Sequence, residues 1–288
     1  MAEIYRTPAG GDAVRARYAA LLGRWPVPSE HRRVATSEGE TFVVAFGPED
    51  APAVLLLHGS SANSASWMGD AQILAERFRV YAVDMIGEPG FSAPSRPPLA
   101  SHVYAAWLDE VRAALRIEQM ALVGISLGGW LALEYATHHP ERVSALALLC
   151  PGGVGRHRNV LLWALPLLLL GPWGRRKILQ RMGGSAGPPD AIPATARAFG
   201  DFMDLIFANF RPRTEVLPPF DDARLRQLTM PVLAVLGAKD VMIDSGGTRD
   251  RLVRNVPNAE IVWLPEAGHI LVGQGGTLGA FLARALFA

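Results

Sequence analysis

The chain has little cysteine, little net charge and no apolar run long enough to cross a bilayer. Cys150 is the only cysteine among 288 residues, which excludes an internal disulfide and any zinc site built from several cysteines. The net charge of +1 indicates neither nucleic acid nor a charged membrane as a partner. The most apolar run, residues 160–173, is broken by Pro166 and Gly171. Its length of about 14 residues is below the roughly 20 that a spanning helix needs, so no stable membrane insertion is expected.

Other signals are absent as well. The amino-terminal residues show no basic segment followed by an apolar run, so no secretory signal is indicated and we expect a cytoplasmic protein. No cluster of metal-ligating residues and no phosphate-binding loop is apparent, so we expect neither a metal nor a cofactor. Cys150 ends an apolar strand and is interpreted as a small buried hydrophobe. No sequence feature indicates an oligomeric state.

The chain does contain a predicted strand, a tight turn and a helix around Ser126. Residues 120–123 are apolar, residues 130–136 have a helical composition, and Gly124 and Gly128 flank the serine. Such a turn exposes the hydroxyl group and aims the first amides of the helix at the same point. A second match to G-x-S-x-G, residues 183–187, has no strand before it and prolines after it, so we interpret it as a loop.

Apolar strands alternate with amphipathic helices on both sides of this turn. The alternation runs from about residue 41 to 150 and resumes at 231, which predicts an α/β fold with a mostly parallel sheet and helices on both faces. We therefore predict a core of residues 1–151 and 230–288, with a helical cap inserted at 152–229. Most apolar side chains of this segment are expected to pack on the core. The apolar stripe within residues 199–210 and the Leu-rich run nevertheless predict a hydrophobic pocket under the cap. We interpret the Leu-rich run as part of the same lid rather than as a membrane-surface element.

Three side chains have the order and the positions of a catalytic triad. Sites in parallel sheets form beyond the carboxyl ends of the strands, where the loops carrying Ser126, Asp240 and His269 are expected to meet. A serine hydroxyl needs a base, and the base needs a carboxylate to fix its tautomer. We predict Ser126 as nucleophile, His269 as base and Asp240 as acid, with Asp244 as the reserve candidate for the acid. His58 is expected to order the loop that it begins.

Several motifs together carry a resemblance to a known family. They are His58-Gly59, Asp84-x-x-Gly87-x-x-Gly90-x-Ser92, the turn at Ser126, His139-Pro140-Glu141-Arg142-Val143, Gly237-Ala-Lys-Asp240 and Gly268-His269. With these motifs the chain resembles the α/β-hydrolase fold family, whose members place the nucleophile, acid and base in this order. The resemblance implies an oxyanion hole formed by the amides of Leu127 and Ser60, with Ser61 as the alternative to Ser60. It also implies that the loop at Asp84 is chiefly structural.

The identity of residue 126 narrows the reaction. Similar proteins that open epoxides or displace halide use an aspartate as nucleophile, whereas this chain has a serine, which suits acyl chemistry at a carbonyl group. We predict a carboxylesterase that cleaves small to medium apolar esters through an acyl-enzyme. Carbon-carbon bond hydrolase, thioesterase, lactonase and perhydrolase activities stay open. A non-catalytic receptor for a hydrophobic ligand is the alternative from another class, because a fold does not determine a function.

Overall fold

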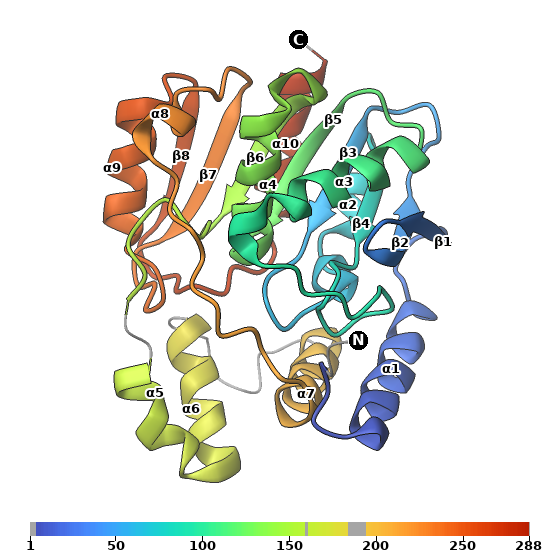
Figure 1. The fold of residues 1–288 in the computed structure, drawn as a ribbon, viewed down its shortest axis with the longest axis vertical. Coiled ribbons are helices and arrows are strands. Elements are labelled where there is room, and N and C mark those ends of the chain that lie inside the picture. The colour runs from blue at the N-terminus through green and yellow to red at the C-terminus, as the bar shows by residue number, and fades with distance from the viewer. Residues whose placement is uncertain (1–3, 159–160, 184–193, 288) are drawn as a thin grey trace.

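The computed structural model describes residues 4–158, 161–183 and 194–287, and an eight-stranded sheet forms its centre (Figure 1). The strands are β1 (Ser29–Thr36), β2 (Gly39–Phe46), β3 (Ala53–Leu57), β4 (Arg79–Val83), β5 (Met120–Ile125), β6 (Val143–Leu149), β7 (Val232–Gly237) and β8 (Ala259–Leu264). The α-helices of the described residues are α1 (Pro8–Leu22), α2 (Ala71–Ala75), α3 (Val103–Ala114), α4 (Leu127–His138), α5 (Leu161–Leu168), α6 (Gly171–Gly183), α7 (Ala194–Asn209), α8 (Asp222–Leu225), α9 (Ser245–Asn255) and α10 (Gly275–Leu286).

The sheet is mostly parallel, as the sequence predicted. Its strand order is β1-β2-β4-β3-β5-β6-β7-β8, in which β1 pairs with β2, and β2 with β4, in antiparallel fashion. All other neighbouring strands are parallel. The central position of β5 brings the turn that follows it to the middle of the carboxyl edge of the sheet. The predicted α/β-hydrolase fold class is therefore confirmed.

Alternate residues of the central strands build two apolar clusters, one on each face of the sheet. In β3, Leu55 and Leu57 belong to the cluster beneath α3, α4 and α9, whereas Val54 and Leu56 belong to the cluster beneath α1, α2 and α10. Every one of these side chains is fully buried. A strand that is apolar at each residue is thus explained by burial on both sides.

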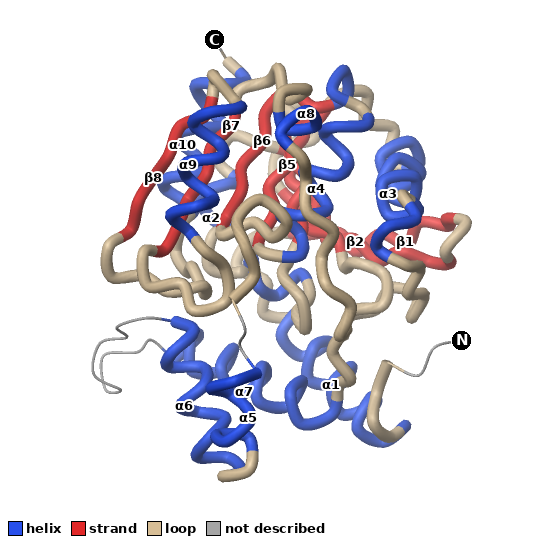
Figure 2. The backbone as a smooth tube through the Cα atoms, turned by 60° about the vertical axis from the view of Figure 1, so that its left-hand side comes forward, coloured by secondary structure: helices blue, strands red, loops and turns tan. Residues whose placement is uncertain are grey.

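Helices α5, α6 and α7 lie beyond the edge at which the parallel strands end (Figures 1 and 2). The apolar stripe of α7 packs largely against α1: the rings of Phe202 and Tyr18 are stacked with their centroids 6.1 Å apart. Phe202, Ile206 and Phe210 are at most 1% exposed. These three side chains therefore pack on the core, which is the placement expected for most apolar side chains of the segment, and they do not line a pocket. The boundaries 152–229 of the cap stay a prediction.

Candidate active site

Ser126 lies in a strained turn between β5 and α4. Its backbone angles are φ 53° and ψ −106°, a region that a residue with a side chain rarely adopts. The two flanking glycines make this turn possible. A Cβ atom on Gly124 would lie 2.3 Å from the carbonyl oxygen of Gly128, and one on Gly128 would lie 2.3 Å from the carbonyl oxygen of Leu57. Strand and helix can therefore pass only because neither glycine has a side chain.

The side chains of Ser126, His269 and Asp240 form a continuous hydrogen-bonded chain. Nε2 of His269 lies 2.9 Å from Oγ of Ser126, and Nδ1 of the same ring lies 2.7 Å from Oδ2 of Asp240. Because an ionised carboxylate can only accept, Nδ1 is the protonated nitrogen and Nε2 accepts from the serine hydroxyl. The structure thus brings together the three residues that the sequence selected for a triad.

The surroundings of Asp240 keep its carboxylate ionised and fixed. Burial raises the pKa of Asp240, but the hydrogen bond and the charge of His269 and the two backbone amides outweigh it and hold the pKa below its usual value. Those amides belong to Met242 and Ile243, which donate to Oδ1 at 2.7 and 2.9 Å. Oδ2 is therefore left for the imidazole.

The reserve candidate, Asp244, has a different place. Its side chain accepts from the amide of Gly247 at 3.2 Å and caps the amino end of α9. Its Oδ1 also lies 3.9 Å from a guanidinium nitrogen of Arg158. The structure gives Asp240, not Asp244, the bond to His269.

Two backbone amides beside Ser126 have no acceptor among the described residues. Leu127 is the first residue of α4, so its amide has no partner within the helix. The amide of Ser60 likewise has no acceptor in the described parts of the chain. The loop at Ser60 adjoins the nucleophile turn, since a Cβ atom on Gly59 would lie 3.8 Å from Cβ of Ser126. By contrast, the amide of Ser61 donates to Oε2 of Glu88 at 2.6 Å, which removes it as a second donor.

Comparison with known proteins agrees with the fold. Residues 52–183 match the family model described as the alpha/beta hydrolase fold. The chain is 32% identical to "Uncharacterized carboxylesterase nap" of Bacillus subtilis (strain 168) over 257 residues, 88% of this chain and 85% of that protein. The chain belongs to the α/β-hydrolase family. "Carboxylesterase YbfK" of the same organism is 29% identical over 88% of this chain and 86% of its own length.

A solved structure gives the same result in three dimensions. The crystal structure of naproxen esterase (carboxylesterase NP) from Bacillus subtilis superposes with a TM-score of 0.81 and 28% identity, covering 97% of this chain and 99% of the other. The similarity thus extends over nearly the whole of both chains, and it makes this α/β-hydrolase carboxylesterase-like.

His58 and Asp84 hold the loops around the site of the α/β-hydrolase in place. Nε2 of His58 accepts from the amide of Met85 at 2.9 Å, so Nδ1 carries the proton and donates to the carbonyl of Gly59 at 2.8 Å. Burial lowers the pKa of His58, which favours this neutral form. Asp84 accepts from the hydroxyl of Tyr18 at 2.8 Å and from the hydroxyl and amide of Ser64. Both residues therefore have the structural roles expected of them.

Three further residues lie near the site, and no sequence pattern indicated this position for any of them. Glu88 is 2% exposed, and burial raises its pKa to about 7. Cys150 lies behind the triad, with Sγ 3.9 Å from the carbonyl of Gly268, and burial raises its pKa to about 12. His157 forms a β-bridge with Ile243, and burial and the neighbouring His269 lower its pKa. Each of these residues contacts a loop of the site that is distant from it in the sequence, so only the folded structure shows the contact.

Two groups of side chains in the described residues have donor atoms close enough together to suggest a metal ion. One is Cys150, Asp240 and His269, whose donor atoms lie within 4.8 Å of one another. Its aspartate and histidine are already bonded to each other, and burial keeps its thiol in the protonated form. The other is His102, Glu134 and His138, in which Nη2 of Arg224 lies 3.0 Å from Oε2 of the glutamate. A guanidinium at that position opposes the binding of a cation.

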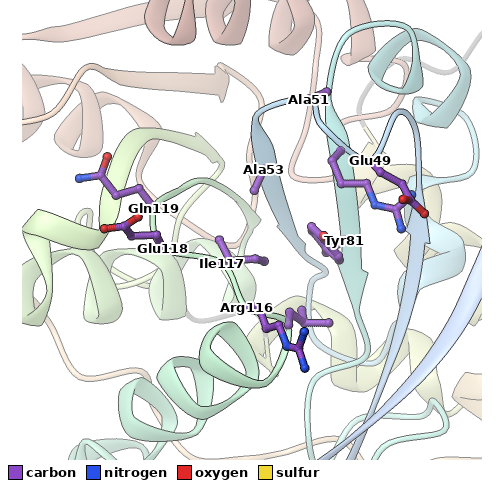
Figure 3. A pocket seen from close by; sticks show the side chains of 10 residues that line it. Glu49, Ala51, Ala53, Tyr81, Arg116, Ile117, Glu118 and Gln119 are labelled. Carbon is purple, nitrogen blue, oxygen red and sulfur yellow. The ribbon is translucent and has the colours of Figure 1, made fainter.

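A cavity of about 560 Å³ lies at the opposite edge of the sheet (Figure 3). It is bordered by Ala53 and Arg79, the first residues of β3 and β4, and by residues 115–119. This places it at the amino ends of the strands, whereas Ser126 follows the carboxyl end of β5. The cavity is therefore separate from the candidate active site.

Proposed function

We propose that this α/β-hydrolase cleaves carboxylic esters of small to medium apolar substrates, with Ser126 as nucleophile, His269 as base and Asp240 as the acid that orients it. One observation carries the proposal: the hydroxyl, the imidazole and the carboxylate are bonded in sequence, at 2.9 and 2.7 Å, at the carboxyl edge of the sheet. The relatives named as carboxylesterases, which align over most of their own length, support the choice of ester bonds.

In the acylation half of the reaction, Oγ of Ser126 attacks the ester carbonyl carbon while Nε2 of His269 takes the hydroxyl proton. The carbonyl oxygen becomes an oxyanion, which the amides of Leu127 and Ser60 stabilise. The tetrahedral intermediate then collapses, the carbon–oxygen bond to the alcohol breaks, and His269 returns the proton to the leaving alkoxide. The alcohol departs and the acyl group stays on the serine.

Deacylation repeats these steps with water. His269 takes a proton from a water molecule, the hydroxide attacks the acyl carbon, and the same two amides hold the second oxyanion. This intermediate then collapses, the bond between the acyl carbon and Oγ of Ser126 breaks, His269 returns the proton to Oγ, and the carboxylic acid departs. Throughout, the ionised Asp240 stabilises the imidazolium by its bond to Nδ1. Water is the only group outside the chain and the substrate that these steps use.

Thioesters, lactones, peracids and carbon-carbon bonds pass through related intermediates, and they remain alternatives for the substrate. We also propose that residues 152–229 form a cap over the site. The backbone supports this: the amides of His269 and Ile270 donate to the carbonyl of Met182, at the end of α6, at 2.6 and 3.1 Å. In the described parts of the chain, no helix is long and apolar enough to cross a membrane. A cytoplasmic location stays a proposal from the sequence.

Labelling with a fluorophosphonate, together with hydrolysis of a panel of p-nitrophenyl esters and thioesters, tests the proposal. We expect the wild-type chain to be labelled and to turn over short and medium acyl esters, and Ser126→Ala to lose both properties. Ser185→Ala is the matched control, because it alters the serine of the other G-x-S-x-G match. Equal labelling of wild type and Ser126→Ala would refute the assignment. Saturable ligand binding without any turnover would favour the receptor alternative.

A further inference from the structure

Helices α5 and α6 form a hairpin whose turn exposes large apolar side chains. Leu165, Leu169, Leu170 and Trp173 are 57%, 83%, 55% and 56% exposed, and they lie within nine residues of sequence on either side of this turn. We call these four residues the hairpin tip. The other exposed large apolar side chains of the described residues are scattered over several elements. Single exposed side chains are ordinary, whereas a concentration of this kind marks an interaction surface.

The hairpin tip lies far from the sheet. In Figures 1 and 2, α5 and α6 lie together at one end of the molecule, with the turn between them pointing away from the strands. The carboxyl end of α6 is the end that contacts the site, through the carbonyl of Met182 and the amides of His269 and Ile270. A 13-residue helix is about 20 Å long. The tip is therefore well separated from the core but joined to the site by one rigid helix.

The segment that carries the hairpin is strongly basic. Residues 152–189 contain six Lys or Arg residues and no Asp or Glu, whereas the rest of the chain has more acidic than basic residues. Lys177 is exposed one turn after Trp173, and its Nζ atom lies 5.8 Å from the centre of that ring. Exposed leucines and a tryptophan beside basic residues are the composition of a surface that binds at a lipid interface.

Because these side chains are exposed, we reverse the interpretation drawn from the sequence alone and propose that the hairpin tip docks on an anionic phospholipid surface, with its apolar side chains among the acyl chains and its basic residues against the headgroups. The positive charge of the segment favours a lipid surface over a second copy of the chain as the binding partner. A symmetric dimer through the tip would place two such basic segments against each other, which costs free energy, whereas a negatively charged lipid layer complements them. The docking is peripheral, because the run is too short to span the bilayer.

The test uses binding rather than turnover, so it does not depend on the proposed ester hydrolysis. The full chain carrying Ser126→Ala is sedimented with vesicles of phosphatidylcholine alone and with vesicles that also contain phosphatidylglycerol. We expect binding to the mixed vesicles, weakened as salt is raised, and little binding to phosphatidylcholine. Absence of binding to the mixed vesicles at low salt would overturn the proposal.

Substitutions then localise the surface. We expect Leu169→Asp combined with Leu170→Asp to lower partitioning at least about tenfold, because two leucines that would enter the lipid are lost and two negative charges are added. Lys177→Gln should lower it about fivefold, the effect of one basic residue near an anionic surface. Val253→Asp is the matched control: Val253 is 61% exposed, but it lies on α9.

Two further outcomes would overturn the proposal. One is equal vesicle binding by Val253→Asp and the double Leu variant, since the tip would then contribute nothing. The other is a dimer in sedimentation velocity that the double variant abolishes, without vesicle binding by the parent chain, because the tip would then bind a second copy. Circular dichroism of each variant establishes that a loss of binding is not a loss of fold.

Discussion

The amide of Ser61 donates to Oε2 of Glu88 at 2.6 Å, and this bond fixes the loop that carries the proposed oxyanion donor. Ser61 has φ 59°, in the left-handed region, so the carboxylate helps to hold a backbone conformation that serine does not favour. With the amide of Ser61 occupied, that of Ser60 has no acceptor among the described residues, in the loop that adjoins the turn of the proposed nucleophile. Glu88 is thus a positioning residue, one step removed from the reacting atoms.

Burial of Glu88 predicts a specific dependence of stability on pH. Its pKa rises from 4.5 in the unfolded chain to about 7 in the folded protein, mainly through burial. Between these values the folded protein retains a proton that the unfolded chain releases, so the free energy of unfolding falls as pH rises through this window and is level above it. Across this pH window the free energy of unfolding falls by about 3 kcal/mol. Glu88→Gln, which can still accept from Ser61, should remove this loss.

Thermal unfolding of wild type and Glu88→Gln at several pH values measures the effect. We expect the difference in stability between variant and wild type to grow in favour of the variant from about pH 5 to pH 8. The exposed Glu49→Gln serves as the control and should leave the pH dependence unaltered. Parallel pH curves for wild type and Glu88→Gln would show that the carboxyl group is not protonated in the folded state as argued.

Asp240 and Asp244 provide a matched pair of substitutions. Asp240→Asn removes the acceptor that fixes the imidazole tautomer, and we expect turnover to fall about 10⁴-fold with little change in KM. Asp244→Asn should leave kcat within a few-fold of wild type and change stability little, since asparagine can cap α9 as aspartate does. Steady-state kinetics on one ester give the comparison. A larger loss of kcat in Asp244→Asn than in Asp240→Asn would identify Asp244 as the catalytic acid.

Two glycine-to-alanine substitutions should act in opposite directions. A Cβ atom at Gly128 would lie 2.3 Å from the carbonyl oxygen of Leu57 and 2.5 Å from that of His58, so strand and helix must separate. We expect Gly128→Ala to cost about 3 kcal/mol and to lower turnover, because the turn at Ser126 moves. At Gly200, within α7, a Cβ atom meets nothing within 4 Å. Gly200→Ala should stabilise the protein by about 0.5–1 kcal/mol, and denaturant unfolding compares the two variants.

Local patterns were sufficient to predict the sheet and to select three side chains that the structure joins by hydrogen bonds. The strands appear in the sequence as apolar runs because helices cover both faces of the sheet. Glycines flank Ser126 because a side chain at either position would clash with the backbone, whatever the rest of the sequence. The order of nucleophile, acid and base restricts the candidates further. The geometry agrees with the choice of Asp240 over Asp244 because only the former meets the imidazole.

Residues that act through tertiary packing could not be found in this way. Nothing in the sequence around Glu88 indicates that its carboxylate meets the amide of Ser61, 27 residues earlier. The stripe on α7 has the same spacing whether it lines a pocket or packs on α1, and only the fold separates these cases. The leucines of the hairpin tip likewise read as core residues, although four large apolar side chains there are exposed.

Cys150 permits a final test that separates serine chemistry from thiol chemistry. The thiol is 1% exposed, and burial, followed by the nearby charge of Asp240, raises its pKa to about 12. Because the thiolate is the reactive form, we expect iodoacetamide at pH 8 to modify the folded chain at least about 1000-fold more slowly than the unfolded chain. Ester hydrolysis should survive this treatment and yet be abolished by a fluorophosphonate. Cys150→Ala measures the background of the labelling. Rapid alkylation of the folded protein with loss of activity would show an accessible, ionised thiol at the site and would contradict the buried position of Cys150.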